Sequence, residues 1–261
     1  MQKEEKLVLE VEDLSKSFGG HQVLNSISFK VCEGERVALI GPSGSGKSTL
    51  INILTRSIGF DGGTIKIDGK NMEDYTDNRD YAQKIGVIRQ QFDLVRELEV
   101  IHNVLAGNLH SWSFLTSLRS LIQPVNPDQA LQALSDVGIE EKAFNVTSSL
   151  SGGEQQRVAI ARLIVQNPEI FIADEPIASL DPTRANSIMD LLTSMAYEKN
   201  KTLFASMHSV EHVLKFFDRV IGIRAGDIVV NEKIENISSG TLDQLYEIQE
   251  VEDEEISDAL S

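Results

Sequence analysis

The sequence predicts an α/β fold: a parallel β-sheet covered by helices, an antiparallel β portion near the N-terminus, and an inserted α-helical subdomain. Three short runs are continuously apolar, as expected for strands that are buried on both faces. They lie at residues 36–40, 170–173 and 202–206. Between the last two runs, apolar residues from Ile188 to Ala196 recur at the three- and four-residue spacing of a helix face.

Two other segments alternate polar and apolar residues, which is the pattern of a half-exposed strand. They are residues 26–31 and residues 64–68, and a turn at residues 61–63 precedes the second. Residues 100–145 contain several helical patterns and no clear strand. We therefore expect the antiparallel portion near the N-terminus and the helical subdomain at about residues 92–165.

Length and composition limit the possible classes of protein. The 261 residues fit one large α/β domain with an inserted subdomain, and 41% hydrophobic residues are enough for a packed core. The formal net charge of -16 argues against a nucleic-acid partner, because binding to phosphates needs clustered Lys and Arg.

Cellular location is also constrained by composition. Cys32 is the one cysteine, so no disulfide can form within the chain, which fits a reducing compartment. The segment from Met1 to Leu9 lacks the apolar stretch of a signal peptide, and no apolar run approaches the ~18 residues of a membrane span. We expect a cytoplasmic protein that another chain holds at the membrane if it works there.

A glycine-rich loop follows the apolar run at 36–40 and precedes an apolar helical segment. It comprises Gly41, Pro42, Ser43, Gly44, Ser45, Gly46, Lys47 and Ser48, with Thr49 next. The glycines let backbone N–H groups turn toward phosphate oxygens, and the helix start adds about half a positive charge. We expect this loop to bind ATP, with Lys47 on the β- and γ-phosphates and the Ser48 hydroxyl on Mg²⁺. A Ser- and Gly-rich surface turn is the alternative, and the flanking strand and helix argue against it.

A pair of carboxylates ends the apolar run at 170–173. We expect Asp174 to hold Mg²⁺ and Glu175 to polarise the attacking water as general base. A pair of acids that follows a phosphate-binding loop by about 130 residues is far more informative than one acid at a strand end.

The string Leu-Ser-Gly-Gly-Glu-Gln-Gln-Arg at residues 150–157 is the most specific in the chain. Ser151, Gly152 and Gly153 open a helix, so free backbone N–H groups there can face a second anion. A small loop at the start of any helix is the alternative, but it does not explain the whole string or its position some 20 residues before Asp174.

These motifs in this order resemble those of ATP-binding-cassette (ABC) ATPases, over about residues 7–240. The resemblance implies a P-loop NTPase core and adds four assignments. Phe18 matches the aromatic residue that stacks on adenine, and Gln90 matches a residue that senses the γ-phosphate through Mg²⁺. Ser179 to Asp181 match the loop across the dimer contact, and His208 matches a histidine that contacts the γ-phosphate. The implied catalytic residues are Glu175, His208, Gln90 and Lys47, and the implied metal ligands are Ser48, Gln90 and Asp174.

The resemblance also implies partners. In the family two copies face each other head to tail, and each ATP lies between one copy's phosphate loop and the other's Ser-Gly-Gly helix. A single copy then has two half-sites. Permease subunits and, indirectly, a periplasmic or extracellular substrate-binding protein complete the transporter. The implied ATPase domain spans residues 1–245, and the acidic residues 246–261 form a tail.

Further detail resembles the phosphonate-importer subgroup. The stretches of this chain that resemble the subgroup are residues 89–95, 103–107, 174–181 and 223–226. Arg89 and the charged residues from Arg96 to Glu99 depart from the subgroup pattern, which bears on the docking partner. The resemblance implies import of a phosphonate, or of phosphite or phosphate, by a protein peripheral to the inner face of the cell membrane.

Two other classes stay open at this point. One is the ATPase of a lipoprotein-release or export system, and the other is a non-transport ATPase that acts on chromosomes or ribosomes. Chromosome-type relatives insert long coiled coils before the Ser-Gly-Gly string. Here Lys47 and Ser151 are 104 positions apart (151 minus 47), and no heptads lie between them. Ribosome-acting relatives usually carry two cassettes, and this chain has one.

Overall fold

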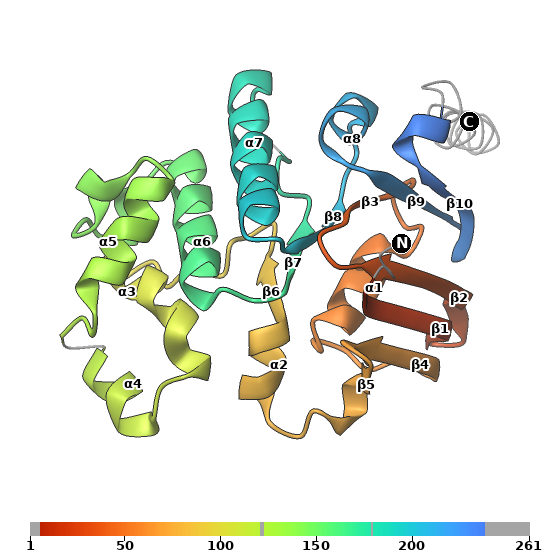
Figure 1. The fold of residues 1–261 in the computed structure, drawn as a ribbon, viewed down its shortest axis with the longest axis horizontal. Helices are drawn as coiled ribbons and strands as arrows, with labels where there is room; N and C mark the ends of the chain where they lie inside the picture. The colour runs from red at the N-terminus through yellow and green to blue at the C-terminus, as the bar shows by residue number, and fades with distance from the viewer. Residues whose placement is uncertain (1–5, 121–122, 179, 238–261) are drawn as a thin grey trace, which may run out of the picture. The chain divides into compact units, whose positions relative to one another are not determined.

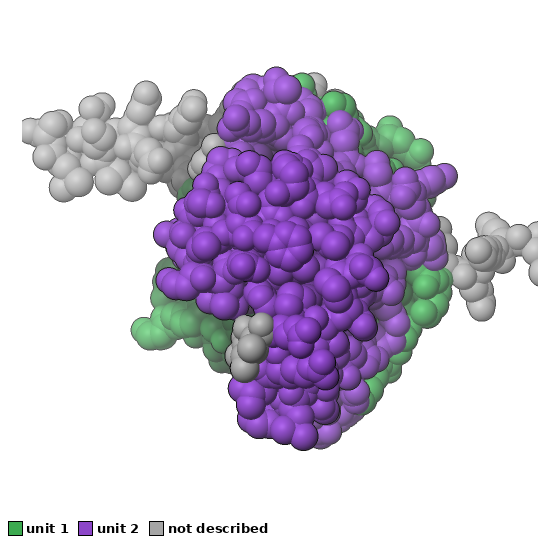
Figure 2. All heavy atoms as spheres, turned by 90° about the vertical axis from the view of Figure 1, so that its left-hand side faces the viewer, with its two compact units in different colours: residues 1–72, 204–261 green, residues 73–203 purple. Residues whose placement is uncertain are grey.

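The structure is a computed structural model that describes residues 6–120, 123–178 and 180–237. Ser179 and the acidic segment 246–261 lie outside the described residues. The chain divides into two compact units, which Figure 2 colours separately. Unit 1 comprises residues 1–72 and 204–261, and unit 2 comprises residues 73–203.

Unit 1 contains the antiparallel sheet that alternation predicts. Its strand order is β2-β1-β4-β5, with β1 at Leu7–Phe18, β2 at His21–Cys32, β4 at Gly62–Ile67 and β5 at Lys70–Asn71. In β2 the apolar Ile27, Phe29 and Val31 are buried, and Ser28 and Lys30 between them are exposed. One face of β2 is therefore core and the other is solvated.

Unit 1 also contains strands in the order β10-β9-β3-β8, of which β8 begins in unit 2. These are β3 (Arg36–Ile40), β8 (Thr202–Ser206), β9 (Arg219–Arg224) and β10 (Asp227–Lys233), with helices α1 (Lys47–Leu54) and α8 (Val210–Phe216). Strands β3 and β9 are parallel, and β9 and β10 are antiparallel. The apolar runs at 36–40 and 202–206 thus form buried strands, as predicted.

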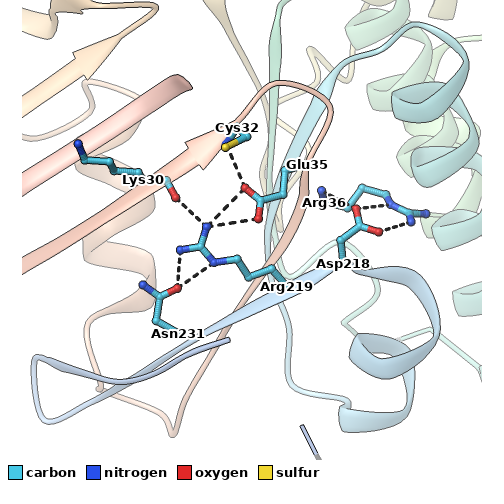
Figure 3. Close-up of polar contacts among 7 residues, drawn as sticks. All are labelled: Lys30, Cys32, Glu35, Arg36, Asp218, Arg219 and Asn231. Atoms are coloured by element: carbon cyan, nitrogen blue, oxygen red, sulfur yellow. Dashed lines mark hydrogen bonds and ion pairs between the residues drawn. The ribbon is translucent and has the colours of Figure 1, made fainter. Parts of the chain in front are cut away.

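A polar cluster ties the two sheets of unit 1 together (Figure 3). The Arg219 guanidinium donates to the Lys30 carbonyl at 2.9 Å and pairs with the Glu35 carboxylate at 3.3 Å. It also donates to Asn231 Oδ1 at 2.9 Å. One side chain on β9 therefore links the end of β2 to β10.

Unit 2 carries the helical part and two parallel strands. Its elements are α2 (Asn78–Lys84), β6 (Ile85–Ile88), α3 (Val100–Leu105), α4 (Phe114–Ser120), α5 (Pro127–Asp136), α6 (Gly152–Gln166), β7 (Ile170–Asp174) and α7 (Pro182–Glu198). Figure 1 shows α3, α5 and α6 gathered side by side, and each packs against the other two. At Gly107, after α3, a Cβ would lie 2.4 Å from the Arg162 carbonyl oxygen, so only glycine allows this close approach to α6.

The predicted helical segments are confirmed between residues 100 and 145. The described residues of that stretch form α3, α4, α5 and short 3₁₀ helices at Ala106–His110 and Glu140–Lys142, and they contain no strand. The face of α7 that periodicity predicts is also buried, with Ile188, Leu192 and Met195 in the core.

Candidate functional site

The glycine-rich loop leaves β3 through positions that only glycine fits. Gly41 has a φ of 148°, and a Cβ there would lie 2.0 Å from the Ile223 carbonyl oxygen. Gly46 has a φ of 110°, and a Cβ would lie 2.7 Å from Cδ2 of Leu24. The loop backbone therefore packs directly against neighbouring strands of unit 1.

Lys47 begins helix α1 and folds back over this loop. It is 5% exposed, and its Nζ donates to the carbonyl oxygens of Gly41 at 2.7 Å and Pro42 at 2.9 Å. No side chain caps α1 at Gly46, and its first turn has no acidic residue. The helix start and the ammonium group together make this end of α1 electropositive.

The other loop residues differ in exposure. Ser45 is 3% exposed, and its Oγ has no hydrogen-bond partner in the part of the chain that the structure describes. Pro42 and Thr49 are half-buried, whereas the exposed residues are Ser43, Gly44 and Ser48. The Ser48 hydroxyl is thus accessible from solvent, as a metal ligand must be.

Phe18 and His208, also in unit 1, are both exposed. Phe18 ends β1 with 49% of its surface exposed, and Lys16 Nζ lies 5.2 Å from its ring centroid. His208 follows β8, and the preceding Met207 N–H donates to the Leu39 carbonyl of β3 at 2.9 Å. His208 and the glycine-rich loop therefore leave their strands at the same edge.

In unit 2, β6 and β7 bring a second group of predicted residues to one sheet edge. The strands are parallel, and Ile88 pairs with Ala173 at their ends. Gln90 follows the first strand, and Asp174 and Glu175 come at the end of the second. Gln90 is exposed and both carboxylates are half-buried. Glu175 has a left-handed backbone, with a φ of 48°.

Ser151 is the N-cap of α6 and forms a capping box with Glu154. The Ser151 N–H and hydroxyl both donate to Glu154 Oε2 at 2.8 Å, and the Glu154 N–H donates to Ser151 Oγ at 3.4 Å. A Cβ added to Gly152 or Gly153 would meet nothing within 4 Å. The helix start is therefore open on the glycine side.

Asp181 caps the next helix, α7, and is exposed. Its carboxylate accepts from the Arg184 N–H at 3.1 Å. A cavity of about 290 Å³ lies between the starts of α6 and α7 and is lined by Ser151, Gly153, Glu154, Arg157, Leu180, Arg184 and Ile188. The two arginines lie beside the predicted anion-binding helix start, although the sequence analysis does not single them out.

Sequence reasoning also missed a tether on the segment after Gln90. Arg162 of α6 donates to the carbonyl oxygens of Asp93 at 2.7 Å and Phe92 at 2.8 Å. Both residues have left-handed backbones, with φ values of 61° for Phe92 and 46° for Asp93. Burial lowers the pKa of the Arg162 guanidinium, and the Asp93 carboxylate opposes this shift.

A second tether involves Asn103 of α3. Its Oδ1 accepts from the Val95 N–H at 2.8 Å, and its Nδ2 donates to the Val95 carbonyl and to Thr147 Oγ1, each at 2.9 Å. The Thr147 hydroxyl in turn donates to the Leu98 carbonyl at 2.8 Å. Residues 92–98 are therefore fixed to the helical part and to the segment just before Ser151.

The predicted residues thus form separate groups within each unit. Unit 1 holds Phe18, the glycine-rich loop and His208, and unit 2 holds the remainder of the described candidates. No group of three or more His, Cys, Asp or Glu suited to a metal occurs among the described residues. Within that part of the chain, no helix combines the length and apolarity that crossing a membrane requires.

Comparisons with known proteins cover nearly the whole chain. A family model described as ABC transporter matches residues 24–178. The phosphonates import ATP-binding protein PhnC 1 of Nostoc sp. is 42% identical over 244 residues, which are 92% of each chain. Its namesake PhnC from Escherichia coli O157:H7 is 39% identical, over 90% of this chain and 93% of the relative.

Solved structures agree with these relatives. The ADP conformation of MJ1267, an ATP-binding cassette of an ABC transporter, has a TM-score of 0.79 and 27% identity, over 92% of this chain and 98% of that chain. The dimeric post-hydrolysis state of the cassette MJ0796, bound to ADP and Pi, has a TM-score of 0.75 and 30% identity, over 88% and 100%. The structure of cbiO1 from Clostridium perfringens, part of the transporter complex cbiONQ, has a TM-score of 0.75 and 29% identity, over 88% and 90%.

The predicted nucleotide-binding fold is confirmed by these structures. The glycine-rich loop, the Ser-Gly-Gly string and the acidic pair Asp174 and Glu175 lie within the residues that the family model matches. The chain belongs to the ABC transporter family, as one of its ATP-binding subunits.

Proposed function

We propose that this ATPase subunit powers an importer whose cargo is a phosphonate, with phosphite and phosphate as close alternatives. The observation that carries the cargo assignment is the 42% identity to a phosphonates import protein over 92% of both chains. The ATPase subunit of a transporter does not contact the transported molecule, so the residues of its nucleotide site do not identify that molecule. The assignment of the cargo therefore comes from the relatives.

For nucleotide binding, we assign Lys47 to the β- and γ-phosphates and the loop N–H groups to the phosphate oxygens. Phe18 offers an exposed ring for the adenine. Ser48, Gln90 and Asp174 supply a hydroxyl, an amide oxygen and a carboxylate. That all-oxygen set fits Mg²⁺, which binds few protein oxygens and keeps several waters.

For hydrolysis, we assign Glu175 as the general base and His208 and Gln90 as groups that contact or sense the γ-phosphate. The half-buried Glu175 directly follows the buried strand β7, which ends at Asp174 and pairs with β6 just before Gln90. Mg²⁺, when bound, would neutralise charge on the phosphates.

The Ser-Gly-Gly helix start serves the ATP of a second copy in this proposal. Ser151 and Gly152 are exposed, and a Cβ at Gly152 or Gly153 would meet nothing within 4 Å, so this helix start has open space around it. The MJ0796 cassette is a dimer in its structure with ADP and Pi. We infer that two copies of this chain pair head to tail and that Asp181 lies at their contact.

The permease is proposed to dock on residues 91–98. Val95 and Leu98 line a groove of about 360 Å³ together with residues of α3 and α4. On α4, Phe114 and Leu115 are each 75% exposed, so the groove continues into an apolar surface that suits an apolar helix. Arg96 and Glu97 on this segment, and Glu99 directly after it, would set the choice of partner by charge. Cysteines at these positions should crosslink to the permease, whereas crosslinks confined to the acidic tail would contradict this docking site.

Docking of this kind would hold the chain at the inner face of the cell membrane. It would also place the chain in one complex with a periplasmic or extracellular binding protein, which contacts the permease from the other side. The apolar groove supports a protein partner rather than a lipid surface, because its Val95 lies next to charges of both signs at 96–99.

Growth of a deletion strain tests the cargo. A strain that lacks this chain and has no redundant importer should fail to grow on a phosphonate as sole phosphorus source, and expression of the intact chain should restore growth. The Glu175→Gln chain is the matched control, because it should fold and assemble without supporting growth. Normal growth of the deletion strain would reject the phosphonate assignment.

A further inference from the structure

The Ser151 hydroxyl, which is proposed to face the second copy's ATP, already has an acceptor. It donates to Glu154 Oε2 at 2.8 Å, and the Ser151 N–H donates to the same oxygen at 2.8 Å. The other carboxylate oxygen, Oε1, lies 3.5 Å from Lys142 Nζ. Both Glu154 and Lys142 are partly exposed, with 30% and 34% of their side chains accessible.

A serine hydroxyl has one proton and can donate one hydrogen bond at a time. A phosphate oxygen at neutral pH is an acceptor, so it can bond this hydroxyl only if the proton turns away from Glu154. The carboxylate also repels a phosphate that approaches the same helix start. The bond from Ser151 to an ionised acceptor is of the stronger, charge-assisted kind.

Positively charged side chains near Glu154 reduce its repulsion of a phosphate. Lys142 pairs with Glu154 from one side. Arg157 and Arg184 line the 290 Å³ cavity together with Ser151 and Glu154. Arg184 also pairs with Asp181 at 3.3 Å, and Arg157 donates to the Val137 carbonyl at 2.6 Å. A phosphate at this helix start therefore meets cations that attract it and one carboxylate that competes for Ser151.

We propose that Glu154 is a positioning residue that engages the Ser151 hydroxyl in the single protomer and so raises the ATP concentration needed for two protomers to pair. This inference rests on the proposed function, since it concerns the ATP that a second copy presents to Ser151. Lys142 lowers the ATP concentration needed for pairing, because its ammonium group pairs with the Glu154 carboxylate and neutralises the charge that repels the phosphate.

The test uses pairing in a hydrolysis-deficient parent, the Glu175→Gln chain, measured by analytical ultracentrifugation over a range of Mg-ATP concentrations. Glu154→Gln should lower the ATP concentration at half-pairing by about three- to tenfold, the size expected when one exposed charge is removed and a charge-assisted hydrogen bond becomes a weaker neutral one. A glutamine at this position still completes a capping box, so the helix start is kept. Lys142→Met should shift the midpoint the other way.

Glu141→Gln is the matched control, because it removes the same charge from the residue next to Lys142, in the 3₁₀ helix Glu140–Lys142. The described acceptor of the Ser151 N–H and hydroxyl is Glu154 and not Glu141. Its midpoint should equal that of the parent. Thermal unfolding of every variant checks the fold, and a role of Glu154 in capping alone would change the unfolding temperature without lowering the midpoint.

Two failures can be told apart. If the Glu175→Gln parent stays monomeric in Mg-ATP, the proposed pairing is wrong and the inference falls with it. If the parent pairs but Glu154→Gln leaves or raises its midpoint, or if Glu141→Gln lowers it equally, the role of Glu154 alone is wrong.

Discussion

Lys47 places a full positive charge on a side chain that is only 5% exposed. The carbonyl oxygens of Gly41 and Pro42 accept from its ammonium group. Such bonds satisfy a buried cation that would otherwise be costly. The residue therefore shapes the loop in addition to offering its charge to a phosphate.

Lys47→Ala should lower Mg-ATP hydrolysis by about 10² or more, the size of losing one strong donor to developing charge. The fold should survive, because β3 and α1 keep their buried faces. Circular dichroism and ATPase rate are to be measured on the same sample, with Lys66→Ala, which removes a half-buried lysine from β4, as control. Undiminished turnover in the folded variant would refute the loop assignment.

Glu175→Gln keeps the size of the side chain but cannot take a proton. Hydrolysis should fall by about 10² to 10⁴, or roughly 3 to 5 kcal/mol of barrier. ATP binding should persist because Lys47 and Ser48 are unchanged, and uncleaved ATP should favour the paired state. The chain should run as a dimer in Mg-ATP and as a monomer without it. A variant that hydrolyses ATP at the unaltered rate would exclude Glu175 as the base.

Helix α6 connects several parts of unit 2. Ser151 caps its start, Arg162 holds the carbonyls of residues 92 and 93, and Gln166 near its end donates to the carbonyls of Ala82 and Ile85 at 2.8 and 3.0 Å. A displacement of the proposed docking segment is therefore resisted by the helix that carries Ser151.

Arg162→Met should cost about 2 to 4 kcal/mol of unfolding free energy, because two carbonyls lose a charged donor. Amide exchange at Phe92 to Val95 should accelerate more than exchange elsewhere, since the segment loses its tether at Phe92 and Asp93, whose backbones are held in the left-handed region. Gln166→Met is the matched control: it removes two bonds from the same helix but leaves exchange at 92–95 unchanged. Equal exchange in both variants would argue against a local tether.

Much of each element is predictable from sequence because its signals are local. The loop at 41–48 combines a buried strand, obligatory glycines and an apolar helix within about twenty residues. The capping box at Ser151 also has a short signal, a serine followed three positions later by glutamate. The bond from Arg162 to Phe92 spans 70 positions, and a lone arginine on a helix has no pattern that specifies its acceptor.

At the scale of the whole molecule, one chain contributes both a phosphate-binding loop and a Ser-Gly-Gly helix start. In the proposed pair each ATP uses the loop of one copy and the helix of the other. Each copy also carries a formal charge of -16, so the two repel at long range and short-range contacts must overcome this repulsion.

Mixing two inactive chains should restore activity. A Lys47→Ala chain keeps its Ser151, and a Ser151→Arg chain keeps its loop, so a heterodimer has one intact site. ATPase activity of the mixture should exceed that of either variant at concentrations that allow pairing. Absence of recovery, with heterodimers demonstrated by native mass spectrometry, would mean that Ser151 does not act across the interface.

The left-handed backbone at Glu175 lowers the stability of the fold at the residue that is proposed to act as the general base. A φ of 48° suits glycine or asparagine, and a longer side chain there costs of order 1–3 kcal/mol. Laboratory selection for heat resistance alone would therefore tend to replace this glutamate and yield sturdier chains that bind nucleotide but no longer turn it over. A thermostable version of this motor has to gain its stability at other positions.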